Sequence, residues 1–436
     1  MRRSKRWAFA LALSAAAVLV GCDDLHREAS PTPVEQVGVQ RVDAEDARFA
    51  ISPGHLEKGV ERTAIRSCRR PLGLEIDRRG RLLVACALLG EIQVIDPTSR
   101  SVLETWGPFY DKLFRLDVVP GDARLIAVGM AGSIAHILNL HTGRPIERVN
   151  VGRNIADMKR LGDTSEYLIV SSQEKQITVL DASTASIERV LRFPEPVGYV
   201  AVAQNSELAA VTGGVYKRTG KGVEMVSGHV YFFNPRQETS IVVGQTLAPG
   251  KMSREPVFVR DDQWLLVPNH TEGTVSVFDV ATRQLYRTLD VKAGPERLII
   301  GPEGRRVYSL NTRSASVSVI ELAPLTVLRD IPLPSPPENG VVSPDGRYLV
   351  LTLPDVPTEK QPVISKPGAP VTEEELALLS EEVGEIGNYI ALVDLHDLTL
   401  ADLIPASADP AAITQSADGR RVYVANFKAN TVSIFQ

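Results

Sequence analysis

A five-residue pattern recurs eight times along the chain: an apolar residue, any residue, two apolar residues and a polar residue. The copies are IQVID, AHILN, ITVLD, VYFFN, VSVFD, VSVIE, IALVD and VSIFQ, ending at Asp96, Asn139, Asp181, Asn234, Asp279, Glu321, Asp394 and Gln436. Successive copies lie 43, 42, 53, 45, 42, 73 and 42 residues apart. A period near 42 residues indicates one repeated structural unit, and the two longer gaps indicate units with insertions.

Each unit shows the same order of strands and turns. A first strand leads into a tight turn, as in SPDGR, SADGR, GPEGR and DRRGR, where Gly and Asp suit positive-φ positions. A second strand, a short loop, the marked strand, a Thr- or Ser-bearing turn and a fourth strand follow. Val, Ile, Leu and Tyr alternate with polar residues as in β-strands, and no helical period runs through the repeat. Four antiparallel strands in about 42 residues match one β-propeller blade, with a solenoid of four-stranded units as the alternative.

The repeat resembles a known family of repeats. VYVANFKANTVSIF is similar to the YVTN-type β-propeller repeat, in which a Tyr-Val-x-Asn strand precedes a Thr-Val-Ser-Val-Ile-Asp strand. VYSLNTRSASVSVIE and LLVPNHTEGTVSVFD match it as well, and the other units match in pattern. The resemblance covers residues 59–436 and implies a propeller fold, but it implies no single function.

The fold class predicted is therefore all-β: a single β-propeller of eight four-stranded blades, or of seven if one unit is wrongly assigned. The last unit lacks its fourth strand. GVERTAIRSCRRPLGLEID (Gly59 to Asp77) is similar to QLYRTLDVKAGPERLIIGP (Gln284 to Pro302), a fourth strand followed by the first strand of the next blade. We therefore expect Val60 to Ile65 to pair with Thr431 to Phe435, which closes the ring and covers two sheet edges.

The N-terminal segment has the features of a targeting signal. Four basic residues within the first six precede an apolar run, Trp7 to Val20, that is shorter than the roughly 20 residues needed to span a bilayer. The run ends in Leu-Val-Gly-Cys22, which resembles a bacterial lipobox; an ordinary signal peptide with an incidental cysteine is the alternative. We predict a signal peptide at residues 1–21, lipidation at Cys22, a polar tether at residues 22–58 and a periplasmic, membrane-anchored propeller at residues 59–436. Whether the inner or the outer membrane holds the anchor is left open.

The cysteines and the net charge bear on a disulfide, on covalent haem and on nucleic-acid binding. An oxidising compartment permits a Cys68–Cys86 disulfide, while the alternative is a buried thiol at Cys86 with Cys68 free. No C-x-x-C-H motif supports covalent c-type haem. A formal net charge of -5 gives no indication of nucleic-acid binding, and we expect a monomer.

Both insertions fall in loops between second and third strands, which share one face of a propeller with the blade-to-blade linkers. They lie near residues 215–225 and 355–388, and we predict that they act as lids over that face rather than as idle decoration. In the second insertion, VTEEELALLSEEVG predicts a short helix with a capping box formed by Thr372 and Glu375.

Two sets of residues are candidate ligands on that face. The linkers carry arginines that would line the mouth of the central channel and bind a carboxylate or phosphate: Arg70, Arg115, Arg153, Arg254 and Arg297. The alternative is that these arginines pair with neighbouring acids and only solvate the rim. His229 and His270 lie in adjacent units and are candidate ligands for a metal or a haem iron, although chance neighbours are the alternative and no third ligand is evident.

Two classes of function remain. The chain contains no G-x-S-x-G, Walker or H-E-x-x-H motif, which favours a non-catalytic binding or scaffold module for an envelope protein partner or a small anionic ligand. The resemblance implies an alternative, because the d1-haem domain of nitrite reductase is also an eight-bladed propeller related to this repeat, and related periplasmic proteins help to make that haem. The alternative is a protein that binds or matures haem d1 or another tetrapyrrole, or an oxidoreductase-like propeller; a lactonase-like enzyme is a further variant. The sequence leaves the cofactor unknown.

Overall fold

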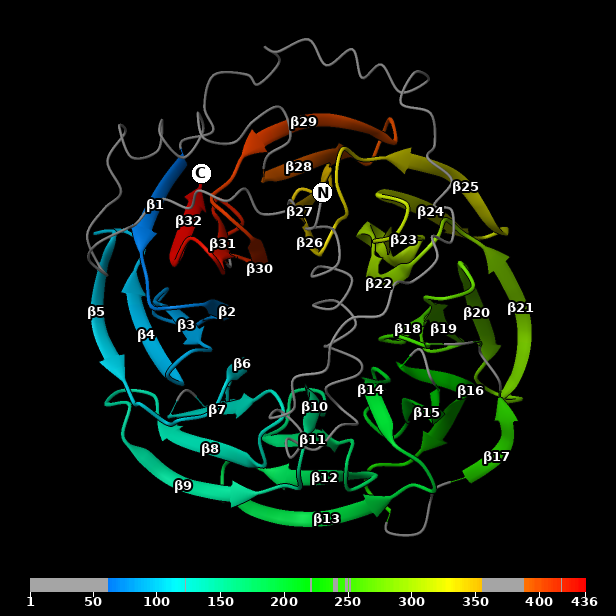
Figure 1. Ribbon diagram of the computed structural model, residues 1–436, viewed down its shortest axis with the longest axis horizontal. Coiled ribbons are helices and arrows are strands. Elements are labelled where there is room, and N and C mark those ends of the chain that lie inside the picture. The colour runs from blue at the N-terminus through cyan, green and yellow to red at the C-terminus, as the bar shows by residue number, and fades with distance from the viewer. Residues whose placement is uncertain are drawn as a thin grey trace, which may run out of the picture.

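The computed structural model describes residues 62–436 with gaps at 122, 220–221, 238–241, 248–249, 251, 355–387 and 417. Within these residues, eight antiparallel four-stranded sheets surround a central axis as the blades of a propeller (Figure 1). The prediction of eight blades is confirmed, and the seven-bladed and solenoid alternatives are wrong.

The strands follow one another from the inside of each blade to its outer edge. Blade 1 contains β2 (Pro71–Ile76), β3 (Leu82–Cys86), β4 (Glu91–Asp96) and β5 (Ser101–Trp106); blade 2 contains β6 (Leu113–Val118), β7 (Arg124–Gly129), β8 (Ile134–Asn139) and β9 (Pro145–Asn150). Blade 3 contains β10 (Ile155–Arg160), β11 (Glu166–Ser171), β12 (Gln176–Asp181) and β13 (Ser186–Arg192); blade 4 contains β14 (Val197–Val202), β15 (Ala209–Thr219), β16 (Gly222–Phe233) and β17 (Val242–Leu247). Blade 5 contains β18 (Val257–Val259), β19 (Trp264–Asn269), β20 (Thr274–Asp279) and β21 (Gln284–Asp290); blade 6 contains β22 (Pro295–Ile300), β23 (Arg306–Asn311), β24 (Ser316–Leu322) and β25 (Leu325–Pro332), with a 3-10 turn, η1 (Pro302–Gly304), after β22. Blade 7 contains β26 (Asn339–Val342), β27 (Tyr348–Leu353), β28 (Tyr389–Asp394) and β29 (Thr399–Pro405); blade 8 contains β30 (Pro410–Gln415), β31 (Val422–Asn426), β32 (Thr431–Phe435) and β1 (Arg62–Arg66).

The ring closes through a strand from the other end of the chain. β1 pairs antiparallel with β32, with Ile65 opposite Val432, and supplies the fourth strand of blade 8 (Figure 1). Ile65 and Val432 are buried in one cluster with Leu82 and Tyr423, so the closing strand packs against blade 1 as well. The predicted closure is confirmed, and the strand is described from Arg62.

The signature Asn and Ser residues of the repeat form hydrogen bonds inside the blades. In blade 6, Asn311 ends β23 and donates from Nδ2 to Ser316 Oγ (3.2 Å) and Ser318 Oγ (2.8 Å). The same amide contacts recur in blade 5, from Asn269 to Thr274 and Ser276, and in blade 8, from Asn426 to Thr431 and Ser433. Buried polar groups must be paired, so the pattern requires Asn on one strand and hydroxyl residues on the next.

The second residue of the five-residue pattern also holds the linker between blades. Gln93 Oε1 accepts from the Cys68 N–H (2.9 Å), and Thr178 Oγ1 donates to the Val151 carbonyl (2.9 Å). Ser318 Oγ accepts from the Lys292 N–H (3.2 Å). One side chain on the third strand therefore fixes the position at which the inner strand of the same blade begins.

The predicted turns and the cysteines adopt defined geometries. Gly346 and Gly419, in SPDGR and SADGR, have φ of 71° and 68°, the left-handed region that these turns require. Cys68 and Cys86 form a disulfide with a Cα–Cα distance of 5.8 Å, so of the two alternatives the structure has the bonded form. The disulfide joins the linker after β1 to the end of β3.

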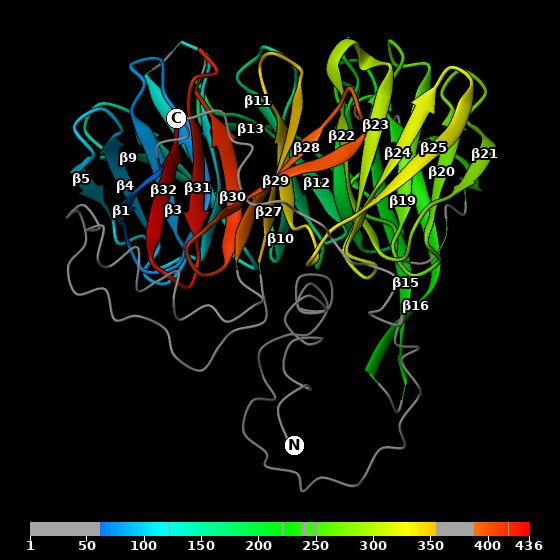
Figure 2. The ribbon, with the colours of Figure 1, turned by 90° about the horizontal axis from the view of Figure 1, so that it is seen from above.

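The first insertion is a hairpin. β15 and β16 stay paired from Ala209 opposite Phe233 to Thr219 opposite Gly222, and the hairpin projects beyond the ring (Figure 2). The second insertion, with its expected helix, and the predicted signal peptide, Cys22 and tether lie outside the described residues. Within the described part of the chain, no helix is long and apolar enough to cross a membrane.

Candidate functional site

The five predicted ligand-binding arginines occupy two kinds of position. Arg70, Arg153 and Arg254 lie in linkers that precede β2, β10 and β18, as expected. Arg115 and Arg297 are instead the third residues of the inner strands β6 and β22. Their placement in linkers was wrong, because these strands begin two residues earlier than either arginine.

Two of the arginines lie away from the others. Arg70 is exposed, and its guanidinium carbon lies 5.6 Å from the centroid of the Phe427 ring. Arg153 is exposed and forms an ion pair with Glu174 (Nε–Oε1, 2.9 Å). Neither has a described ion pair with the residues at the centre of the ring.

Charged side chains from the inner strands meet at the centre of the ring. Arg115 contacts Asp157 at 3.4 Å, which joins blades 2 and 3. Glu255, which precedes β18, is shared by two cations: Lys159 of β10 and Arg297 of β22, the latter at 3.1 Å. The Lys159–Glu255 pair joins blade 3 to the linker before blade 5 and bypasses blade 4, so it reaches across the ring. The inner strands β10, β14 and β18 of these blades line the centre of the ring (Figure 1).

A second group continues this network toward blade 6. Arg254 is buried and forms an ion pair with Glu296 at 3.0 Å (Nε–Oε2). The Tyr199 hydroxyl lies 3.4 Å from Arg254 Nη1, and His270 Nε2 lies 3.6 Å from Glu296. Arg115, Arg254 and Arg297 thus form ion pairs with acidic residues, as the alternative to ligand binding describes. Ligand binding by the same arginines stays a prediction.

Burial and neighbouring charges shift the pKa values of this network. Although burial opposes it, the charges of Lys159, Arg297 and Arg115 hold the pKa of Glu255 well below its ordinary value. Burial raises the pKa of Asp157, against the opposing effect of Lys159 and Arg115. Glu255 is therefore ionised at any pH near neutrality.

A protonated carboxyl group lies beside the network. Burial, together with the charge of Asp409, raises the pKa of Glu338 to about 8, and Arg297 and Lys428 oppose the shift. Asp409 itself pairs with Lys428 at 3.1 Å. At neutral pH, Glu338 is thus a neutral hydrogen-bond donor close to Arg297.

The charges of the network do not balance. Arg115, Lys159, Arg254 and Arg297 supply four cations, while Asp157, Glu255 and Glu296 supply at most three ionised carboxylates. Glu338 adds no charge when it is protonated. Among these residues the cations therefore outnumber the ionised carboxylates while Glu338 holds its proton, and such an excess favours binding of an anion.

Sequence reasoning missed several residues of this network. Asp157, Lys159 and Glu255 were not among the candidates, and neither was the group formed by Asp117, Arg160 and Glu75 near the other ends of β6, β10 and β2. Arg160 pairs with Asp117 at 3.5 Å, and burial raises the pKa of Glu75 to about 7. The available signal was charge inside a predicted inner strand, as in IADMKR, whereas the two middle strands of the same blade, EYLIVS and QITVLD, carry charge only at their ends.

The two predicted metal ligands have separate partners. His229 Nδ1 bonds Glu195, which precedes blade 4, while His270 lies beside Thr312 (Nε2–Oγ1, 3.4 Å) and Glu296. Burial and the charge of Arg254 lower the pKa of His270 to about 4, so its imidazole is neutral. No described contact joins the two histidines, and metal ligation stays a prediction.

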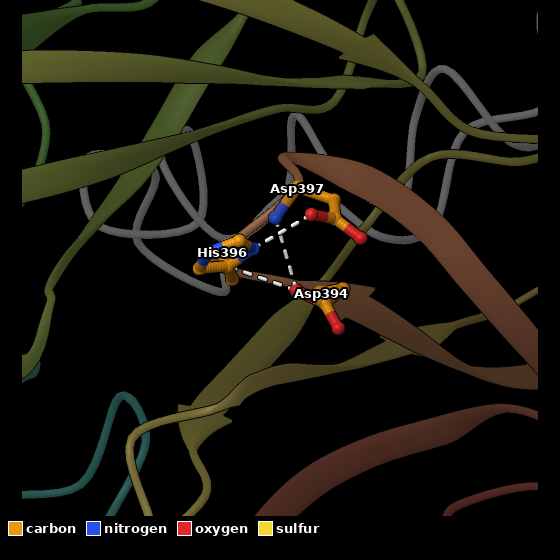
Figure 3. Close-up of side chains that lie close together, drawn as sticks. All are labelled: Asp394, His396 and Asp397. Atoms are coloured by element: carbon orange, nitrogen blue, oxygen red, sulfur yellow. Dashed lines mark hydrogen bonds and ion pairs between the residues drawn. The ribbon is translucent and has the colours of Figure 1, made fainter.

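Asp394, His396 and Asp397 form the one group of three potential metal ligands within reach of each other among the described residues (Figure 3). Asp394 Oδ1 accepts from the N–H groups of His396 (2.8 Å) and Asp397 (3.1 Å). Asp181 accepts from the Ser183 N–H (2.7 Å) in the equivalent turn of blade 3. The group is therefore explained by the turn that ends each marked strand.

The fold and its centre define an eight-bladed β-propeller with a charged core at its axis. No protein-family model matches the chain, and no curated protein matches it. Among solved structures, the chain is similar to the dihydro-heme d1 dehydrogenase NirN in complex with DHE, with a TM-score of 0.59 and 15% identity over 83% of this chain and 73% of that one. It is also similar to Kuenenia stuttgartiensis hydrazine synthase, with a TM-score of 0.52 and 14% identity over 87% of this chain and 98% of that one. At these identities, the similarity establishes the fold alone.

Proposed function

We propose that this propeller is a non-catalytic binding module that takes a small anionic ligand at the centre of its ring, beside Arg297 and Glu338. The observation that carries the proposal is the surplus of cations over ionised carboxylates in a partly buried network. Guanidinium groups bind carboxylates and phosphates through paired hydrogen bonds, and the neutral Glu338 carboxyl can donate another. We further propose that the ring is tethered in the periplasm through Cys22, where an envelope protein is a second possible partner.

Binding of citrate and of inorganic phosphate tests the proposal. Either probe should raise the melting temperature of the protein, because a ligand that binds only the folded state stabilises it in proportion to its concentration over Kd. Arg297→Gln should weaken binding of the probe about tenfold or more, as expected when a charged hydrogen bond is lost. Arg153→Gln is the matched control, because that arginine is exposed and pairs with Glu174 outside the network.

If citrate and phosphate up to about 10 mM leave the melting temperature unchanged, the anion proposal is contradicted, because even a ligand with a millimolar Kd would stabilise the protein measurably. If Arg297→Gln and Arg153→Gln weaken binding of the probe equally, the binding site lies elsewhere.

A tetrapyrrole is the second candidate ligand. It is favoured by the similarity to NirN, whose structure is a complex with DHE, over 83% of this chain. The neutral imidazole of His270 and the buried Arg254 would contact iron and carboxylate, respectively. Addition of haem to the purified protein should then shift the Soret band, and His270→Ala should abolish the shift; an unchanged spectrum excludes this candidate.

A further inference from the structure

Four exposed apolar side chains gather on one part of the loop face, over blades 1 and 2. Leu88 and Leu89 follow β3, Tyr110 precedes β6 and Met130 follows β7, with exposures of 44%, 47%, 84% and 38%. Most other exposed large apolar side chains in the described residues lie on fourth strands around the rim: Leu103, Ile146, Ile187, Val190, Leu285, Tyr286 and Leu328. We call Leu88, Leu89, Tyr110 and Met130 the loop-face platform.

Backbone hydrogen bonds connect the loops that carry the platform. The Tyr110 N–H donates to the Leu89 carbonyl (3.3 Å), and the Phe109 N–H donates to the Gly90 carbonyl (2.7 Å). The Met130 N–H donates to the Lys112 carbonyl (2.8 Å). Three loops from two blades thus form one surface, and its apolar side chains remain exposed although the backbone beneath them is ordered.

Cations flank the platform. Lys112 is exposed two residues after Tyr110, and Arg69 and Arg70 are exposed in the linker whose Arg70 carbonyl accepts the Ala87 N–H (2.9 Å). The one carboxylate within the Tyr110–Lys112 segment, Asp111, bonds the buried His136 at 2.6 Å. The platform therefore presents apolar and aromatic groups at its tip, and the exposed cations Arg69, Arg70 and Lys112 outnumber the single carboxylate, Asp111, in the segments that flank it.

We propose that the loop-face platform rests on an anionic lipid bilayer, with its apolar tip in the headgroup region and its cations against lipid phosphates. Tyr and Leu side chains favour this interface, and each cation near an anionic surface strengthens binding about fivefold. The proposal is independent of the anion site at the centre of the ring.

Charge favours a bilayer over a second copy of the chain. A two-fold contact between two platforms would bring Lys112 and Arg70 of one copy toward the same cations of the other, and like charges oppose such a contact. The expected anchor at Cys22 lies 40 positions before Arg62, which limits the distance between the ring and a membrane to about 130 Å and raises the local concentration of lipid.

A fluorophore on the platform tests the proposal. Leu89→Cys in the full-length chain with Cys22→Ser provides one reactive thiol, because Cys68 and Cys86 are bonded to each other. The label is an environment-sensitive dye, and the vesicles contain phosphatidylcholine with phosphatidylglycerol. Leu103→Cys on β5 is the matched control, since it is a leucine of the same blade with 50% exposure that lies on the fourth strand. Both labelled proteins have the same N-terminus, so binding through that segment affects both equally.

We expect the emission at position 89 to shift to the blue with anionic vesicles, and that at position 103 to stay unchanged. Arg70→Gln together with Lys112→Gln should weaken vesicle binding about 25-fold, and added salt should weaken it too. An unchanged spectrum at position 89, or equal shifts at both positions, overturns the proposal. A shift at position 89 that needs no vesicles and grows with protein concentration overturns it in favour of self-association.

Discussion

The substitution Ile65→Ala tests whether β1 holds the ring together. Ile65 is fully buried in β1 and packs with Leu82, Tyr423 and Val432 from blades 1 and 8. The change removes three carbon atoms, worth about 2.4 kcal/mol at about 0.8 kcal/mol per buried methylene. The cavity left between two blades adds to this, so we expect a total loss of about 3–4 kcal/mol in the free energy of unfolding.

Ile187→Ala provides the matched control. Ile187 lies on β13, the fourth strand of blade 3, which is the position that β1 takes in blade 8, but it is 43% exposed. The same atoms are removed there without a buried cavity, and we expect a loss below about 1 kcal/mol. Because both changes replace Ile by Ala in a fourth strand, differences in β-propensity cancel in the comparison.

Urea unfolding followed by far-ultraviolet circular dichroism measures both variants. A midpoint for Ile65→Ala well below that of Ile187→Ala supports closure through β1. If the free energies of unfolding of the two variants differ by less than about 0.5 kcal/mol, packing of β1 does not stabilise the ring and the reasoning is refuted.

Three further predictions concern the blades, the disulfide and the centre. Asn311→Ala should destabilise the protein by about 2 kcal/mol, because Ser316 and Ser318 lose their amide donor. Asn205→Ala, in an exposed turn, is the control and should leave the stability nearly unchanged, and thermal unfolding compares the two variants. Cys68→Ser with Cys86→Ser should lower the free energy of unfolding by about 3 kcal/mol in a chemical denaturation assay, since the bond closes a loop with a sequence separation of 18. Glu338 has a pKa of about 8 in the folded state against an ordinary value of 4.5, so the folded state holds a proton that the unfolded state releases, and stability should fall as pH rises from about 4.5 to about 8. Glu338→Gln should remove this fall, which a plot of the free energy of unfolding against pH measures. If the plots for the variant and the wild type stay parallel across this range, Glu338 does not hold a proton in the folded state.

Local patterns predict the fold because each blade is specified by its own residues. The marked strands, the glycine turns and the Asn–Ser contacts recur within about 42 residues, a distance over which sequence periodicity is visible. Closure was also predictable, because the segment before Asp77 has the same order as the junction between blades 5 and 6. The start of β6 and β22 was placed too late, because Leu113 and Pro295 continue the linker pattern in sequence although they already pair in the sheet.

The arrangement at the centre was not predictable in the same way. Lys159 and Glu255 are 96 positions apart and belong to blades that are not neighbours, so no local pattern relates them. The sequence does indicate which units carry charged residues near their inner strands. Which of these residues form ion pairs depends on how far each side chain reaches across the ring. The disulfide was left open for a similar reason, because spacing alone does not show that Cys68 and Cys86 approach to a Cα–Cα distance of 5.8 Å.

The pairing within the network indicates which arginine is available to a ligand. If Arg115 turned away from Asp157, a carboxyl group with no exposed surface would lose the one ion pair that it forms among the described residues, and breaking a buried ion pair costs about 3–5 kcal/mol. Arg254 is itself buried, and its movement would leave Glu296 without its closest cation. Arg297 differs because Glu255 keeps Lys159 when Arg297 moves. An anion can therefore bind Arg297 without leaving any carboxylate unpaired, which makes this arginine the first contact we expect for a ligand at the centre of the ring.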